Sequence, residues 1–591
     1  MARLDRRGLR LYAGSLKPFL HDAALFRARA AVRFDQGIER RPDHTPKLPT
    51  SHGASPITMT FTVEETVGQK LMLAFEGTEP QAGILKTIRT RHVGGITLFR
   101  SLNVENPSQV RGLTTALQEA ASQAGQPPLL IAADQEGGQL MAIGDTTPFP
   151  GNMALGATGS VDLARKTGRA LGRELAALGI NVNYAPVCDV NSNPHNPNIG
   201  IRSFGEDPAM VARFCAAMVE GLQSCGVAAT AKHFPGHGDA STDPHYGLPV
   251  VTHEPERLAR VEFPPFEAAI EAGVRLVMTT HVAFPSLNRG VALPSTLSPR
   301  LLKGLLRDSM GFRGVVISDA MDMAAIEQGS GLIVDAIAAV ATGVDLLLLL
   351  DNPAAYEAIY SALTQATRRG LLSMAQMKSS AGRVLTLKQW VAGVPQPPLD
   401  VVGCSEHRDL ALEIAARSIT LVRDEDNLLP LRPPADARLA VILPQPRDLT
   451  PADTSSYVTC NLAQALRRYH SSVDEFVIPH APSEEDIASL RQRVSGYEML
   501  IVGTINSLGE PGQARLVQTL LKTGVPTVAI ALRSPYDLRT YPTAPTYLCT
   551  YSILEPTMKA LAKALWGEIP FQGRLPVSIP DMYPIGHGLV T

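Results

Sequence analysis

Eight short apolar runs, each ending in a polar residue and followed by a longer amphipathic segment, dominate the chain between Thr62 and Asp351. They are residues 69–77, 94–100, 129–138, 182–190, 227–238, 276–282, 314–320 and 343–351. Alternating strand-like and helix-like segments are typical of a parallel sheet covered by helices. Because eight strands close a parallel barrel, the sequence predicts an α/β fold with a (β/α)₈ TIM barrel. An open doubly wound sheet is the alternative.

A second region follows a proline-rich segment without periodicity, residues 391–403, which predicts a linker. Beyond it the apolar runs are residues 439–443, 475–478, 499–504, 527–532, 546–551 and 575–579. Helical patterns separate most of them, which predicts a smaller α/β domain, an αβα sandwich. It contains no glycine-rich phosphate loop, so no nucleotide site is expected.

These boundaries divide the chain into four parts. We predict a basic, disordered extension at residues 1–58, a catalytic barrel at 59–392, a linker at 393–402 and a C-terminal domain at 403–591. Met59 lies just before a capping-box pattern that begins at Thr62 and ends at Glu65, which marks the start of the first helix.

Composition narrows the class of partner. A net charge of −2 over 591 residues offers no long-range attraction for nucleic acid or an anionic membrane, so a small molecule is the expected partner. The six cysteines lack any framework or metal-site spacing, no apolar run is long enough to span a membrane, and the N-terminus lacks the apolar core of a secretory signal. These features predict a cytoplasmic location; the oligomeric state is not indicated.

The densest polar stretch is residues 232–249, where an apolar run leads into a loop rich in His, Asp, Gly and Pro. Lys232 and His233 are expected at the strand tip, with Asp243 and His245 on the loop beyond it. A carboxylate bonded to one imidazole nitrogen fixes the tautomer and leaves the other nitrogen to move protons. Surface histidines or zinc ligands are the alternative interpretation, but the density of the stretch favours catalysis or substrate binding.

A second carboxylate, Asp319, ends the apolar run 315–317. Alone it would be interpreted as a helix cap. Retaining glycoside hydrolysis, however, needs a carboxylate nucleophile facing an acid/base group across the anomeric carbon. The other polar residues expected at strand tips, and therefore in the same barrel mouth, are Asp134, Asp189, Lys232, His233, His281 and Asp351.

Residues 232–245 and 314–319 resemble the family 3 glycoside hydrolases, in particular the β-N-acetylglucosaminidases with a histidine–aspartate dyad. Further similar stretches are residues 134–138, 198–205, 417–421, 532–538 and 573–580, so the resemblance runs from about Thr62 to the C-terminus. It implies that Asp319 is the nucleophile, His245 the acid/base and Asp243 its orienting partner. The implied ligands of the sugar ring are Asp134, Arg202, Lys232 and His233, with His281 as a further pocket histidine.

The activity implied is that of a retaining exo-β-N-acetylglucosaminidase acting on muropeptides, as in peptidoglycan recycling, or on chitooligosaccharides. No metal or organic cofactor is implied. The alternatives are a β-N-acetylglucosaminide phosphorylase, a β-glucosidase or xylosidase of the same family, and an inactive sugar-binding protein. One departure concerns the stretch where the family usually has arginines, which here reads Gln139, Leu140, Met141 and Ala142, so a basic contact near the sugar is expected to be missing.

Overall fold

The structure is a computed structural model that describes residues 61–326 and 330–590. The predicted extension, residues 1–58, lies outside the described residues. Within the described part of the chain, none of the helices combines the length and the hydropathy needed to cross a membrane.

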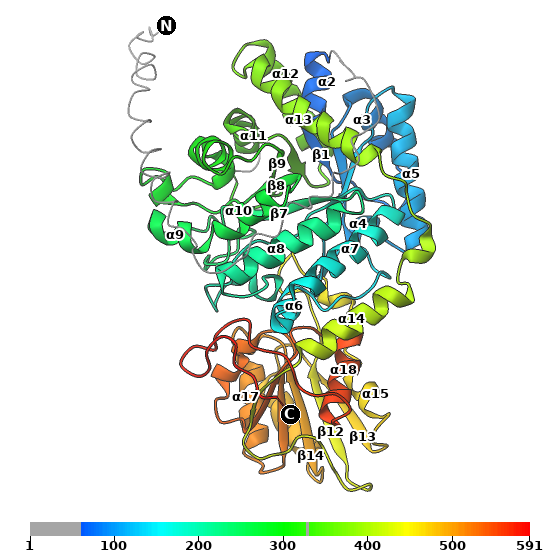
Figure 1. Ribbon diagram of the computed structural model, residues 1–591, viewed down its shortest axis with the longest axis vertical. Helices are drawn as coiled ribbons and strands as arrows, with labels where there is room; N and C mark the ends of the chain where they lie inside the picture. The colour runs from blue at the N-terminus through cyan, green and yellow to red at the C-terminus, as the bar shows by residue number, and fades with distance from the viewer. Residues whose placement is uncertain (1–60, 327–329, 591) are drawn as a thin grey trace, which may run out of the picture. The chain divides into compact units, whose positions relative to one another are not determined.

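The first sheet has eight parallel strands in the order β10-β1-β2-β3-β6-β7-β8-β9. These are β1 (Leu71–Leu73), β2 (Gly95–Leu98), β3 (Leu130–Ala133), β6 (Val182–Asn183), β7 (Ala228–Phe234), β8 (Leu276–Thr279), β9 (Val315–Ser318) and β10 (Leu347–Leu349). A parallel bridge between Ile317 and Leu346 links the two outer strands and closes the ring. All eight predicted runs contain one of these strands, which confirms the TIM-like barrel (Figure 1).

Helices and one hairpin precede, connect and follow these strands. They are α2 (Val63–Gly68), α3 (Ala82–Arg91), α4 (Arg100–Asn103), α5 (Pro107–Gln123), hairpin strands β4 (Gln135–Gly137) and β5 (Leu140–Met141), α6 (Asn152–Thr158), α7 (Val161–Ala177), α8 (Pro208–Gln223), α9 (Pro255–Val261), α10 (Pro264–Glu271), the π-helix η4 (Arg300–Ser309), α11 (Ser330–Thr342), α12 (Pro353–Arg368) and α13 (Met374–Ala392). The predicted capping box is present, because the Thr62 side chain accepts from the Glu65 amide and the Glu65 carboxylate accepts from Thr62 N.

Two of the amphipathic segments between the barrel strands do not form a single α-helix. The amphipathic segment 257–272 is two helices, α9 and α10, because Pro264 and Pro265 cannot continue the hydrogen-bond ladder of a preceding helix. The segment 298–310 forms a π-helix, a rarer winding that the apolar pattern does not distinguish from an α-helix.

The barrel interior is filled by apolar side chains from alternate strand positions, including Met72, Tyr184 and Met278. Leu387 and Val391 of α13 belong to the same buried cluster. Since every other strand residue points inward, this packing leaves the polar residues at the carboxyl ends of the strands to form the mouth.

The second sheet has the order β11-β16-β15-β14-β12-β13, with only the β11–β16 pair antiparallel. Its strands are β11 (Thr420–Asp424), β12 (Leu439–Pro444), β13 (Val473–Ile478), β14 (Met499–Thr504), β15 (Thr527–Ala531) and β16 (Thr546–Cys549), and its helices are α14 (Ser405–Ser418), α15 (Leu462–Leu466), α16 (Glu484–Arg493), α17 (Pro511–Leu521) and α18 (Glu555–Leu565). Ala440 and Ile442 of β12 join one apolar cluster, while Val441 joins a cluster on the other face. Helices therefore cover both faces, as an αβα sandwich requires.

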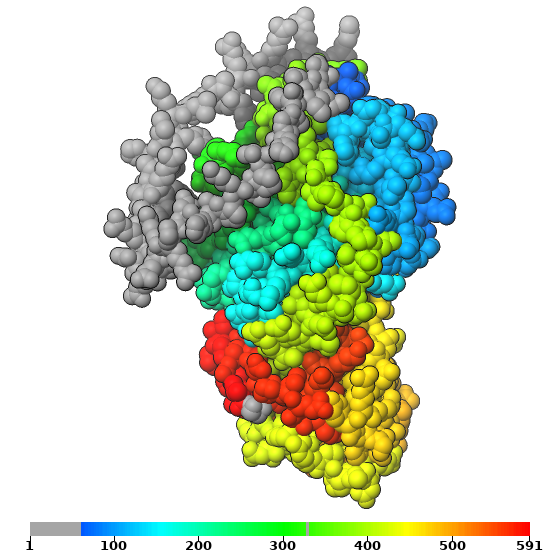
Figure 2. All heavy atoms as spheres, turned by 45° about the vertical axis from the view of Figure 1, so that its right-hand side comes forward, coloured from blue at the N-terminus to red at the C-terminus, as the bar shows by residue number. Residues whose placement is uncertain are grey.

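One predicted strand of this sheet was wrong. Residues 575–579 form no strand, and only an isolated bridge from Ile579 to Tyr583 is present there. Pro576 and Pro580 lack the amide hydrogens that a strand ladder uses. The sixth strand is instead β11, which pairs antiparallel with β16. The chain that joins the barrel to this sheet, from α13 to α14, is yellow-green in Figure 2 and lies on the surface shown there.

Candidate active site

The predicted site residues follow or end five strands of the barrel. Asp134 follows β3, Lys232 and His233 lie in β7, His281 follows β8, Asp319 follows β9, and Asp243 and His245 lie on the loop after β7. Parallel strands direct all their carboxyl ends to one side, so these side chains share the barrel mouth. Arg202 reaches the same region from the η1 turn (Gly200–Arg202) after β6. Asp351 is exposed beyond β10.

Four charged side chains form what we call the mouth cluster: Asp134, Glu136, Arg202 and Lys232. The Lys232 Nζ atom lies 2.5 Å from Asp134 Oδ1 and 2.6 Å from Glu136 Oε1. Arg202 donates two hydrogen bonds to Glu136, at 2.8 and 3.0 Å, and one to the Asn198 side chain at 2.9 Å. The Asp134 side chain retains 22% exposure whereas that of Glu136 retains 1%, so Asp134 is the member open to a ligand.

The pKa shifts of the cluster follow from burial and pairing. Burial would raise the pKa of Glu136, but the charges of Arg202 and Lys232 outweigh it and lower that pKa to about 2. Burial would lower the pKa of Lys232, but Asp134 and Glu136 raise it above its usual value. Both groups are therefore charged at neutral pH, so Lys232 provides a fixed positive charge beside Asp134.

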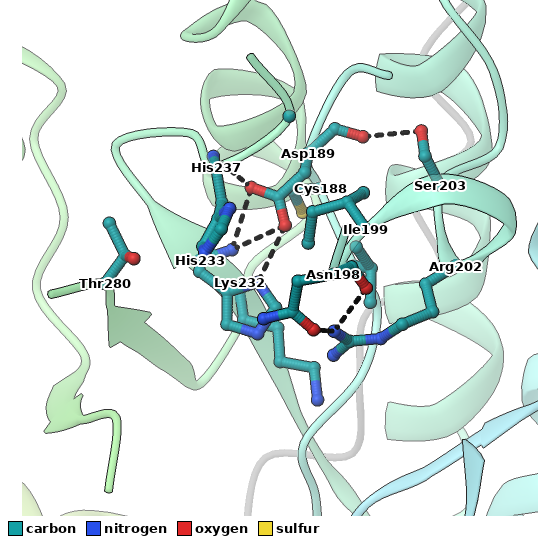
Figure 3. A network of polar contacts seen from close by, with 12 residues as sticks. Cys188, Asp189, Asn198, Ile199, Arg202, Ser203, Lys232, His233, His237 and Thr280 are labelled. Carbon is teal, nitrogen blue, oxygen red and sulfur yellow. Dashed lines mark hydrogen bonds and ion pairs between the residues drawn. The ribbon is translucent and has the colours of Figure 1, made fainter. Parts of the chain in front are cut away.

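His233 is oriented by Asp189, a buried carboxylate in the segment that follows β6 (Figure 3). The Asp189 Oδ2 atom lies 2.7 Å from His233 Nδ1, and Asp189 Oδ1 accepts from the His237 amide at 2.6 Å. Burial would raise the pKa of Asp189, but His233 and His237 lower it. Since an ionised carboxylate only accepts, His233 Nδ1 carries the hydrogen and Nε2 is left for another partner.

Asp319 is partly exposed at the mouth, and its Oδ1 accepts from the Ala320 amide at 2.8 Å. Burial would raise its pKa, but His233, His281 and His245 all contribute to lowering it. The carboxylate is therefore ionised, as a nucleophile must be. Burial raises the pKa of Tyr184, inside the barrel, and the charges of Asp134 and Asp319 raise it further, so both carboxylates lie within electrostatic reach of one phenol.

His281 has both ring nitrogens occupied by protein groups. Nε2 lies 3.0 Å from the Ala320 carbonyl oxygen and Nδ1 lies 2.9 Å from Thr296 Oγ1. The ring therefore supports the backbone beside Asp319, and its contact with substrate stays a prediction.

Asp243 and His245 form a pair, with His245 Nδ1 2.6 Å from Asp243 Oδ1. Asp243 is buried and the His245 side chain is 24% exposed. Burial would raise the pKa of Asp243, but hydrogen bonds from the His245 side chain and backbone lower it, so Asp243 is an ionised acceptor. His245 Nδ1 must then donate, and Nε2 remains to exchange a proton with a ligand.

The loop that carries this pair is fastened at several points. A Cβ at Gly238 would lie 1.7 Å from the Val190 carbonyl oxygen, so only glycine permits this approach to the chain after β6. His253 Nε2 lies 2.6 Å from Asp239 Oδ2. The Pro244 carbonyl, between the paired residues, accepts from the Ala325 amide at 3.1 Å.

The β4–β5 hairpin, where the expected arginines are absent, is contacted by the second domain. Thr454 donates its amide to the Gln139 carbonyl at 2.8 Å, and the Met141 amide donates to Thr454 Oγ1 at 3.1 Å. Arg100, after β2, donates to the Met141 carbonyl at 3.2 Å, and its guanidinium lies 4.4 Å from the Tyr457 ring centre. A cation therefore does contact the hairpin, but it comes from a different strand end.

Metal-type ligands gather at one place among residues 61–326 and 330–590. Atoms of Cys404, Glu406 and His407 lie within 4.8 Å of one another, near the start of α14. His407 Nδ1 already lies 2.7 Å from the buried Glu174 carboxylate. None of the three is among the residues of the barrel mouth.

Sequence reasoning missed Glu136 and His237 as members of the site, and placed Asp189 at the mouth without a role. Glu136 had a usable signal: it is two residues from Asp134, and side chains two apart in an extended segment share one face. His237 lies in the dense polar stretch 232–249, but its burial had no local signal, because it results from the loop packing on the chain after β6.

Comparison with known proteins identifies the family of the chain. Residues 62–387 match the N-terminal domain model of glycosyl hydrolase family 3, and residues 419–584 match its C-terminal domain model. Beta-hexosaminidase A of Pseudoalteromonas piscicida is 33% identical over 90% of this chain and 99% of its own length. A beta-N-acetylglucosaminidase/beta-glucosidase of Cellulomonas fimi is 31% identical over 87% of this chain and 93% of its own. The solved family 3 β-N-acetylglucosaminidase from Paenibacillus sp. str. FPU-7 superposes with a TM-score of 0.84 at 38% identity, covering 88% of this chain and 99% of that one.

Proposed function

Because the chain belongs to glycosyl hydrolase family 3 and is a glycoside hydrolase with β-hexosaminidase relatives, we propose that it is a retaining exo-β-N-acetylglucosaminidase. The observation that carries this proposal is the arrangement of the mouth. An ionised carboxylate, Asp319, and a carboxylate-held imidazole, His245, stand beside a buried ion cluster that offers paired donors and acceptors to sugar hydroxyls.

In the first step, a carboxylate oxygen of Asp319 attacks the anomeric carbon while His245 Nε2 gives its proton to the glycosidic oxygen. The carbon–oxygen bond to the aglycone breaks and a glycosyl ester of Asp319 forms. In the second step, the neutral His245 ring takes a proton from water, which attacks the same carbon and releases Asp319. Two inversions restore the β configuration.

Ring recognition is assigned to the mouth cluster and His233. Asp134, the more exposed carboxylate, accepts from a ring hydroxyl, and Lys232 and Arg202 hold that carboxylate and its neighbour Glu136 in place. His233 Nε2, left open by the bond from Nδ1 to Asp189, is available to the same ring. A substrate lacking a matching hydroxyl would leave one of these groups unpaired and would be discriminated against.

The substrates we propose are short soluble glycosides with a terminal N-acetylglucosamine, muropeptides or chitooligosaccharides, processed in the cytoplasm without a metal or organic cofactor. Both chemical steps are proton transfer and carboxylate displacement, which these side chains supply by themselves. Hydrolysis of β-glucosides is a second candidate activity, since the relative from Cellulomonas fimi carries both names.

Whether water or phosphate accepts the glycosyl group in the second step can be tested directly. Phosphate carries negative charge, which a carboxylate base would repel and an imidazole would not, so the dyad also permits phosphorolysis. We expect a nitrophenyl β-N-acetylglucosaminide to be cleaved equally fast with and without phosphate, yielding free N-acetylglucosamine. Formation of the sugar 1-phosphate as the main product would instead make the protein a phosphorylase.

The acid/base assignment is tested by changing the leaving group. A nitrophenolate departs without a proton, whereas the alcohol of a disaccharide needs one. His245→Ala should therefore lose on the order of 10² to 10⁴ more activity on a disaccharide than on the nitrophenyl glycoside. Equal losses on both substrates would remove His245 from proton transfer.

A further inference from the structure

His237 is a buried histidine beside the dyad that the mechanism above does not use. Its residue is 1% exposed, and its ring packs edge-on against His233 with 5.8 Å between ring centres (Figure 3). Its backbone amide donates to Asp189 and its backbone carbonyl accepts from Asn196 at 2.9 Å. The backbone is thus fixed, which leaves the ring as the part to be explained.

Neither ring nitrogen of His237 has a hydrogen-bond partner among the described residues. Burial lowers its pKa to about 4 despite the nearby charge of Asp189, so the ring is neutral at neutral pH and carries one N–H donor and one acceptor. Buried polar groups are nearly always paired, and a histidine kept only for packing would be expected to have its nitrogens satisfied. The ring therefore has a hydrogen-bonding task that the protein groups in place do not fulfil.

A matching unpaired acceptor lies on the same loop. Asp243 uses Oδ1 for both the ring and the backbone amide of His245, at 2.6 and 3.0 Å. Its Oδ2 is buried, and within the part of the chain that the structure describes it has no partner. Burial would raise the pKa of Asp243 and the hydrogen bonds from His245 lower it, with a smaller lowering contribution from His237, which lies six positions earlier on the same loop.

We propose that His237 is a positioning residue for the dyad: its ring N–H donates to Asp243 Oδ2, directly or through one water molecule, when the site is engaged. Asp243 then bridges two imidazoles, one through each oxygen. A carboxylate held at both oxygens cannot rotate about its Cβ–Cγ bond, so it holds His245 in one orientation toward the glycosidic oxygen. This inference rests on the acid/base role of His245 proposed above.

The test compares two leaving groups in two variants of His237. His237→Phe keeps a planar ring of similar size and removes both nitrogens, while His237→Gln keeps a donor. A positioning residue acts on the step that needs the proton, so His237→Phe should lower kcat/KM on a disaccharide about 10-fold more than on a nitrophenyl glycoside. His237→Gln should recover part of that difference.

His253→Phe is the matched control, because His253 also binds a carboxylate of the same loop, Asp239, at 2.6 Å, outside the dyad. It should change both substrates by the same factor. The second arm is a double-variant cycle: in an Asp243→Asn background, His237→Phe should cost at most about 2-fold more, because the acceptor it serves has been altered.

The outcomes distinguish failure of the positioning role of His237 from failure of the acid/base role of His245. If His245→Ala shows the leaving-group bias and neither His237 variant does, or if the His237 and Asp243 effects multiply independently, the inference is overturned and the proposed function stands. If His245→Ala shows no bias, both fail. Should His237→Phe not fold, as judged by circular dichroism, the Gln variant and the cycle built on it decide the matter.

Discussion

The two ends of the barrel each hold a buried cluster of charged side chains, and the two are built differently. The mouth cluster joins residues at the carboxyl ends of the strands. The base cluster, Lys70, Arg307, Asp345 and Arg383, lies at the opposite end, since Lys70 directly precedes β1 and Asp345 lies two residues before β10. In the base cluster, Asp345 lies 2.8 Å from Arg307 and 2.7 Å from Arg383.

The charged groups of the base cluster are hydrogen-bonded to one another and to neighbouring protein groups. Both Asp345 oxygens accept hydrogen bonds, from Ser380, from both arginines and from the Val316 amide, and Lys70 Nζ donates to two backbone carbonyls and Ser380. At the mouth, Asp134 remains partly exposed, and His233 and His245 each keep one ring nitrogen that is not bonded to any of the residues that the structure describes. The same residue types thus stabilise the fold at one end and are left available for a ligand at the other.

The largest expected effect is at the mouth. Asp319→Ala should lower turnover by about three or more orders of magnitude, because no other carboxylate occupies its position after β9. The melting temperature should stay within a few degrees of wild type. A folded variant that keeps a tenth of the activity would remove Asp319 from the mechanism.

The matched change in the base cluster should lower the free energy of unfolding and leave activity nearly unchanged. Asp345→Asn leaves Lys70, Arg307 and Arg383 without their shared carboxylate, and breaking a buried ion cluster costs about 3–5 kcal/mol. Denaturant unfolding should record that loss, while kcat/KM of the folded enzyme stays within about 2-fold of wild type. A large loss of kcat/KM without a loss of stability would contradict the division between the two ends.

Lowering the pH should destabilise the fold through protonation of Glu136 in the mouth cluster. Its pKa falls from 4.5 to about 2 on folding, so it contributes stability that is present above pH 4.5 and is lost as pH falls toward 2. The full shift corresponds to something on the order of 3 kcal/mol. Unfolding curves should therefore show wild type more stable than Glu136→Gln at pH 7, with a difference that shrinks between pH 4.5 and 2. A constant difference would mean that the charge of Glu136 is not what stabilises the fold.

The smallest effect is a gain in stability. Lys388 of α13 is buried, its amine has no partner among the described residues, and burial lowers its pKa from 10.5 to about 7. A lysine whose pKa is lowered on folding destabilises the protein increasingly as pH falls from 10.5 to 7. Lys388→Met should raise stability by about 2 kcal/mol at pH 7, and the gain should disappear near pH 10.5. A gain that is independent of pH would assign the effect to packing.

The barrel, and the place of most candidate site residues at its mouth, could be predicted from sequence because their signals are local. Each strand is an apolar run with a polar residue at its end, and Asp243 and His245 lie two positions apart. Pairing over distance has no such signal: Lys232 binds Asp134 across 98 positions, and Arg202 binds Glu136 across 66. The base cluster has no local signal either, because Asp345 precedes its strand and its partners Arg307 and Arg383 come from distant helices.

The central claim is that Asp319 attacks the anomeric carbon and forms a covalent intermediate. The most direct measurement is proton NMR of the first product released from a β-N-acetylglucosaminide, recorded before mutarotation. Two successive inversions at one carbon predict β-N-acetylglucosamine as that product. If α-N-acetylglucosamine appeared first, water would have attacked directly and the assignment of Asp319 as nucleophile would be contradicted.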